Sequence, residues 1–234
     1  DVAYSANFDG AGTLKITGTM TTDEAIGSAA DMGIIDIDGQ ITSTDTIKGD
    51  ILDLDGTIAG ATSLVIDSTN ALGGSITTTG VTTLTGATTL TANSSINTTD
   101  AIVLFGGAVN GTDLDLTINS GTAATNFVGI VGGSAGVGAI ALTGALNLDA
   151  AITDAESISV SLASDIGASI TTTGTAATTM TFSDVANISA AAVLTTANTN
   201  ISLEQVTGAN ALTLVAGTGN ITTSAAMTAV TTLT

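Results

Sequence analysis

Two pairs of aspartates have the types and spacing that come closest to a chemical site in this sequence. Asp36 and Asp38 are followed by glycine, and so are Asp53 and Asp55. Corresponding members of the two pairs are offset by 17 positions (53 − 36 = 17). Clustered carboxylates together with backbone carbonyls are the ligands that Ca²⁺ takes. The four aspartates are therefore a candidate calcium site, provided that the fold stacks the two segments.

A solvated acidic surface is the other interpretation of these four residues. Fifteen of the 21 acidic residues precede residue 116, so the aspartates belong to a generally acidic half of the chain. Like charges about 5 Å apart repel by roughly 1 kcal/mol in water, which hydration can tolerate and a divalent cation would remove. The complete calcium loop D-x-D-x-D-G with a distal glutamate is absent. Both interpretations stay open at this point.

The composition argues against catalysis and against nucleic-acid binding. The 234 residues include no His, Cys, Trp or Pro, and Lys15 and Lys48 are the two basic residues. Proton transfer, nucleophilic attack and transition-metal binding mostly use side chains that are missing here. A net charge of −19 repels phosphate. We therefore expect no enzymatic activity, no nucleic-acid partner and, since no apolar stretch is long enough, no membrane span.

Short β-strands are the elements that would have to position the aspartates. Apolar doublets with one residue between them, such as Ile35/Ile37 and Leu52/Leu54, place both apolar side chains on one face of an extended chain. The intervening aspartates then point to the opposite face. The 47 threonines and the 28 glycines also favour extended chain and turns over helices.

Bulky apolar residues recur six residues apart, and this second spacing selects one all-β architecture. A six-residue step fits a strand of two or three residues followed by a tight corner, whereas sandwiches and barrels need about 8 to 12 residues per strand. Three such steps close a triangular coil. We predict an all-β parallel β-helix (β-solenoid) with coils of about 18 to 20 residues, about 13 coils and a length near 60 Å. The clearest hexads are Leu14, Met20, Ile26; Ile35, Ile41, Ile47; Leu52, Ile58, Leu64; and Ile140, Leu146, Ile152, Ile158.

A longer repeat accompanies the hexads. Related segments recur along the chain with anchor residues 50, 50, 44 and 54 positions apart. This pattern predicts a single solenoid domain over residues 1–234, built from about five degenerate repeats of roughly 50 residues. The anchors are Leu14, Leu64, Leu114, Ile158 and Leu212.

One stretch resembles a known group of proteins. Residues 109–122 read VNGTDLDLTINSGT and are followed by Phe127 and by Val131-Gly-Gly. They are similar to the repeats of filamentous-haemagglutinin-type and other bacterial β-strand-repeat surface proteins, chiefly over residues 100–160. The resemblance implies a secreted or surface-exposed parallel β-helix, right-handed, with fibre-forming or adhesive roles. The six-residue spacing by itself also fits a left-handed helix. It carries over no catalytic residue.

Stacked coils have consequences for the surface and for assembly. Each residue lies over its equivalent one coil away, at about 4.8 Å, so that Thr and Asn can form outward ladders. Both ends of the stack present unpaired backbone groups, and the sequence has no proline to block them. We therefore expect an extracellular filament subunit that polymerises head to tail with copies of itself. The alternatives are a fragment of a longer chain, and an adhesin or surface-layer segment that contacts a host-cell or matrix surface.

Overall fold

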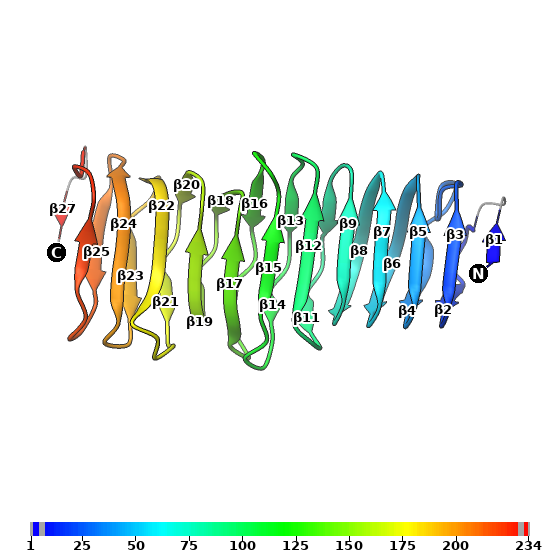
Figure 1. Cartoon of the computed structure of the whole chain (residues 1–234), viewed down its shortest axis with the longest axis horizontal. Coiled ribbons are helices and arrows are strands. Elements are labelled where there is room, and N and C mark those ends of the chain that lie inside the picture. The colour runs from blue at the N-terminus through cyan, green and yellow to red at the C-terminus, as the bar shows by residue number, and fades with distance from the viewer. Residues whose placement is uncertain (1, 5–7, 229–231, 234) are drawn as a thin grey trace.

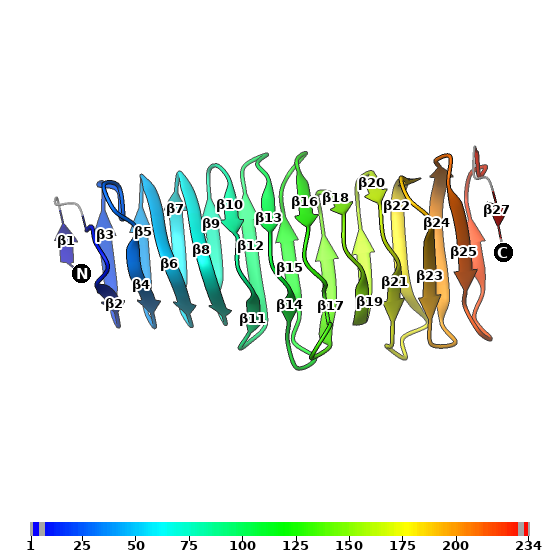
Figure 2. The same cartoon turned by 180° about the vertical axis from the view of Figure 1, so that it is seen from behind.

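The computed structural model describes residues 2–4, 8–228 and 232–233, and these residues form one stack of parallel strands (Figure 1). All 26 strand pairings are parallel, and the described residues contain no helix, so none that could cross a membrane. The two ends of the chain lie at opposite ends of the rod (Figures 1 and 2). The prediction of an all-β solenoid is confirmed.

The strands are short. In chain order they are β1 (Val2–Tyr4), β2 (Thr13–Ile16), β3 (Thr19–Thr22), β4 (Met32–Ile37), β5 (Gln40–Ser43), β6 (Thr46–Leu54), β7 (Thr57–Ala61), β8 (Ser63–Leu72), β9 (Ser75–Thr78), β10 (Thr82–Leu84), β11 (Thr88–Leu90), β12 (Ser94–Thr98), β13 (Val103–Phe105), β14 (Val109–Asn110), β15 (Leu116–Asn119), β16 (Ala124–Phe127), β17 (Val137–Leu142), β18 (Ala145–Leu148), β19 (Ile152–Val160), β20 (Ser164–Ile166), β21 (Ile170–Thr172), β22 (Thr178–Ile188), β23 (Ala192–Thr196), β24 (Asn200–Thr207), β25 (Ala211–Val215), β26 (Ile221–Thr223) and β27 (Thr232–Leu233).

Each turn of the solenoid has three faces, and the hexads place one apolar residue on each. Ile35, Ile41 and Ile47 pair with Leu52, Ile58 and Leu64 of the next turn. All six side chains are fully buried. We call the faces that carry Ile35, Ile41 and Ile47 the first, second and third face. The hexad spacing therefore predicted the three-sided coil correctly, because three six-residue steps return the chain to the same face.

The number of turns is smaller than predicted. On the first face, ten pairing steps lead from Leu14 to Leu214, an average of 20 residues per turn (200/10) and about 48 Å of stacked strands. The shortest step on this face joins Ile35 to Leu52, and the longest joins Ile170 to Leu194. The difference arises at corners: two residues join β4 to β5, whereas residues 111–115 join β14 to β15. The prediction of about 13 turns is thus wrong, since it assumed uniformly tight corners.

The core is a column of aliphatic side chains with an aromatic centre. Phe105 and Phe127 stack on successive turns of the third face, with ring centroids 5.1 Å apart and 19° between the ring planes. The predicted outward ladders are present in part, as in the 3.1 Å contact between the Thr57 and Ser75 hydroxyls. Other threonines point inward, and their hydroxyls satisfy one another, as Thr78 and Thr82 do at 3.1 Å. The abundant threonine therefore lines both the surface and the interior corners.

Glycines at the corner between the first and second faces allow successive turns to stack closely. A Cβ atom at Gly56 would collide with the carbonyl oxygen of Gly39, and one at Gly74 would collide with that of Gly56. The glycine that follows each aspartate pair is therefore required by backbone contact between coils.

The variant Gly56→Ala tests this close contact. We expect it to lower the free energy of unfolding by about 1–3 kcal/mol, because the backbone must shift to accommodate the methyl group. Gly12→Ala is the control, since a Cβ there meets no atom within 4 Å. Chemical denaturation of both variants measures the effect, and equal stabilities would contradict the packing argument.

Candidate functional site

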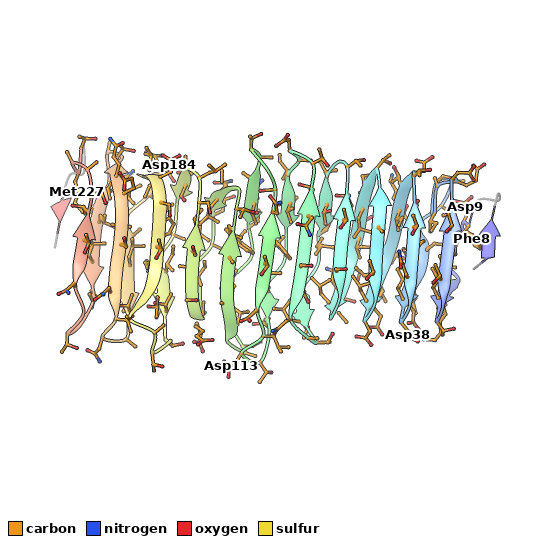
Figure 3. The ribbon with its side chains drawn as sticks, viewed as in Figure 1. Phe8, Asp9, Asp38, Asp113, Asp184 and Met227 are labelled. Carbon is orange, nitrogen blue, oxygen red and sulfur yellow. The ribbon has the colours of Figure 1, made fainter. Side chains whose placement is uncertain are left out.

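The four predicted aspartates lie on two adjacent strands, as the spacing of the two pairs indicated. Asp36 of β4 pairs with Asp53 of β6, while Ile35, Ile37 and their partners face the core. Asp38 and Asp55 follow their strands directly, at the corner between the first and second faces. We call this the aspartate corner; it comprises residues 38–39, 55–56, 73–74, 91–93 and 111–115. Figure 3 shows Asp38 and Asp113 along the same long edge of the rod.

A lysine that the sequence analysis did not include completes this cluster. Lys15 of β2 pairs with Asp36, one turn before it. The Lys15 Nζ atom lies 2.7 Å from Asp36 Oδ2 and 2.9 Å from Asp38 Oδ2. These two hydrogen bonds raise the pKa of Lys15. Lys15 and Asp36 are 21 positions apart in the sequence, whereas the two aspartate pairs are 17 positions apart. A search for residues 17 positions before Asp36 therefore misses Lys15. A search that allows the coil length to vary would have found it.

Among the described residues, the second aspartate pair, Asp53 and Asp55, has no lysine partner, and Asp53 carries the electrostatic cost. Partial burial raises the pKa of Asp53, and the charges of Asp55, Asp36 and Asp38 raise it further, while Lys15 opposes them. The ionised form of Asp53 is therefore less stable in the folded chain than in the unfolded chain. That cost is present at neutral pH and disappears as the pH falls through the raised pKa.

The variant Asp53→Asn is expected to be more stable than wild type at pH 7, by at most about 0.5 kcal/mol, because it removes one carboxylate from a like-charged stack that solvent screens at this exposed position. The gain should shrink as the pH falls toward about 3, where the wild-type carboxyl is protonated in both states. Thermal melts between pH 3 and pH 7 measure it. The exposed Asp23→Asn is the control, and a gain independent of pH would contradict the electrostatic explanation.

Calcium at Asp36, Asp38, Asp53 and Asp55 stays a prediction. Within the described residues, no group of three or more acidic, His or Cys side chains is arranged to hold a metal ion. The Lys15 ammonium group lies against two of the four carboxylates, where it would compete with a bound cation. The geometry thus favours an acidic surface whose charge is partly neutralised by Lys15 over one that is neutralised by a bound cation.

Calcium titration of Lys15→Met tests the ion directly. If the stacked carboxylates bind Ca²⁺, this variant should bind it about fivefold more tightly than wild type, because a positive charge that competes for the same carboxylates is removed. Lys48→Met is the control, since Lys48 is exposed on the third face. Calorimetry without binding heat, and melts that CaCl₂ does not shift, would exclude calcium and leave the solvated acidic surface.

A polar groove lies farther along the same corner. Its volume is about 490 Å³, and Asp55 and Asp115 are among the residues that line it. Asn93 donates to Asp115 Oδ2 at 3.3 Å and accepts from the Asp115 backbone N–H at 3.0 Å. The groove lies where the corner lengthens from two residues to five. Its floor includes the stacked hydroxyls of the second face: Thr57, Ser75, Ser95 and Thr117.

The groove could hold a ligand rich in hydroxyl groups, because carboxylate, amide and hydroxyl groups face it and no aromatic side chain does. Sequence reasoning missed it. The useful signal would have been the 22-residue spacing of Asn93 and Asp115, which one long turn places side by side.

No protein-family model matches this chain, and no curated protein or solved structure shows significant similarity to it. The resemblance to filamentous-haemagglutinin-type repeats is therefore supported at the level of the parallel β-solenoid alone.

Proposed function

We propose that the chain is a structural subunit of an extracellular filament or surface fibre, in which solenoids join head to tail and no chemistry is catalysed. A parallel stack has the same strand direction in every turn, so one end can continue the other without rearrangement. In the described residues, β26 pairs with β24 on one side only, and β2 pairs with β4 on one side only. Each of these edges can accept a further strand.

The interior column whose last member among the described residues is Ile221 is the observation that carries the proposal. Ile158, Met180 and Ile201 precede Ile221 in this column and are at most 1% exposed, whereas Ile221 is 45% exposed. A further turn would cover Ile221 as each earlier turn covers its predecessor. Complete burial of such a side chain contributes about 1.5–3 kcal/mol. An added coil is therefore favoured by apolar burial as well as by backbone hydrogen bonds.

Electron microscopy of the purified chain over a range of concentrations tests the proposal. We expect unbranched filaments with an axial repeat near 50 Å, the length of about ten stacked turns. Monodisperse short particles at high concentration would contradict head-to-tail growth. Fractionation of the source cells, with the chain in the external fraction, tests the extracellular location, which the family resemblance suggests.

An adhesin or surface-layer segment of a larger secreted protein is the second candidate, and the polar groove favours it. Carboxylates and hydroxyls arranged in an open groove suit the surface of a glycan or an extracellular matrix. A lattice that dissolves on chelation or at high salt would support the surface-layer role. A single filament that resists chelators would support the fibre.

A further inference from the structure

The outward side of the second face presents two rows of small polar side chains. On six consecutive turns, three successive residues point outward, inward and outward, and the inward one is buried in the core. Of the twelve outward side chains, two on each turn, eleven carry a hydroxyl or an amide group, and Ala141 is the exception. Strands β9, β12, β15 and β17 lie side by side here in a straight row (Figure 1). We call this surface the hydroxyl face; it comprises residues 75–77, 95–97, 117–119, 141–143, 159–161 and 181–183.

The hydroxyl face repeats regularly in two directions. Ser75 pairs with Ser95, and Ser95 pairs with Thr117. Paired residues on successive turns are about 4.8 Å apart, and the two outward residues of one turn are about 6.6 Å apart, twice the rise per residue. The first of the two rows also continues beyond the hydroxyl face, since ten pairing steps link Thr19 to Thr222. The face is therefore a two-dimensional array of hydrogen-bonding groups with fixed repeats.

The side chains of this array are held in place and are available to an external partner. Every strand of the hydroxyl face pairs with a neighbour on both sides, and fully buried residues such as Ile96 and Ile118 anchor it from below. Threonine side chains are also stiff about their first torsion angle. In the part of the chain that the structure describes, the hydroxyls of Ser95, Thr117 and Thr181 make no hydrogen bond. A ligand that matches the array thus meets groups that are already ordered.

The hydroxyl face carries no acidic or basic residue, which restricts the class of ligand. Carboxylates border it at the corners of the coil: Asp100, Asp115, Glu156 and Asp184. A charged side chain within the array would have to lose its hydration when a neutral surface covers it, and that loss costs free energy. Hydroxyl and amide groups instead exchange one hydrogen bond to water for another. The matching ligand is therefore a neutral, periodic surface of hydrogen-bond donors and acceptors.

Ice and crystalline polysaccharides are two such surfaces, and the residues of the array favour ice. The prism faces of hexagonal ice present water oxygens in a rectangular pattern, with a shorter repeat close to the spacing of the turns and a longer repeat close to the spacing of the two rows. Sugar rings, by contrast, pack their apolar sides on exposed aromatic rings. Phe182 is the one aromatic residue of the hydroxyl face, and its side chain is buried.

We propose that the hydroxyl face binds the surface of ice crystals. Each hydroxyl contributes a weak contact, but a rigid array engages many water molecules of the crystal at once, so that the contacts act together. The polar groove borders the first row at Ser75, Ser95 and Thr117, where further water can be held. Ice binding needs a single chain alone, so it does not depend on the proposed filament.

The variant Thr117→Tyr tests ice binding. When ice grows slowly from a solution of the purified chain, we expect wild type to be enriched in the ice. Thr117→Tyr should lower this enrichment at least about fivefold, because the ring holds the crystal away from the neighbouring turns and removes their simultaneous contacts. Thr89→Tyr is the matched control, since Thr89 is an exposed strand threonine on the first face. Exclusion of wild type from the ice, or equal losses in the two variants, would overturn the proposal.

Two further measurements make the test specific. Thr117→Ser keeps the hydroxyl and should bind ice nearly as well as wild type, which guards against misfolding of the tyrosine variant; a loss as large as that of Thr117→Tyr would contradict recognition through hydroxyls. Retention on crystalline cellulose without enrichment in ice would overturn ice as the ligand and assign a polysaccharide. Enrichment in ice of a chain that forms no filaments in electron micrographs would support ice binding and contradict the filament.

Discussion

Phe127→Ala is expected to lower the free energy of unfolding by about 3–5 kcal/mol. Phe127 is fully buried and stacks on Phe105 one turn earlier, so its removal leaves a cavity at the centre of the core. The surrounding rungs are fixed at the strand spacing by backbone hydrogen bonds and cannot collapse into the space. Because each turn contacts only its neighbours, the loss should also separate the unfolding of the two halves.

Guanidinium denaturation monitored by circular dichroism measures this effect. Val128→Ala is the control, since Val128 is the next residue along the chain and is 46% exposed. We expect a change below about 0.5 kcal/mol there. Equal effects of the two substitutions would contradict the placement of Phe127 in the core.

Ile221→Asp is expected to raise the critical concentration for filament growth at least about 100-fold. In the proposed joint, Ile221 is covered by the first turn of the next subunit, and an aspartate there would be buried without a partner. Such burial costs several kcal/mol, and a difference of about 1.4 kcal/mol corresponds to a factor of ten in affinity. The folded monomer should be little affected, because the side chain is 45% exposed within it.

Light scattering and pelleting over a concentration series measure filament growth. Val193→Asp is the control, because it adds the same charge to the side of the rod. Filaments of Ile221→Asp that grow at the wild-type critical concentration would show that the joint lies elsewhere.

Several features of the candidate site could be predicted because they depend on spacing alone. Asp36 and Asp53 pair as their separation in the sequence indicated, since the intervening turn has tight corners. Ile140 and Ile158 also pair directly, three hexads apart. Lys15 was missed because its turn is longer, and the groove at Asn93 was missed because the corner beside it lengthens. The family resemblance, the longer internal repeat and the right-handed coil stay predictions.

The sequence by itself determined the coil and its three faces. Apolar residues at every second position determine which side chains face inward, and their recurrence every six residues determines where the corners lie. Both patterns follow from the local geometry of an extended chain. The tertiary structure alone decided which residues meet between turns. Lys15 contacts two aspartates, Asn93 contacts Asp115 across a long turn, and inward threonines satisfy one another. These contacts depend on the summed length of every corner between the partners, and no local pattern encodes that sum.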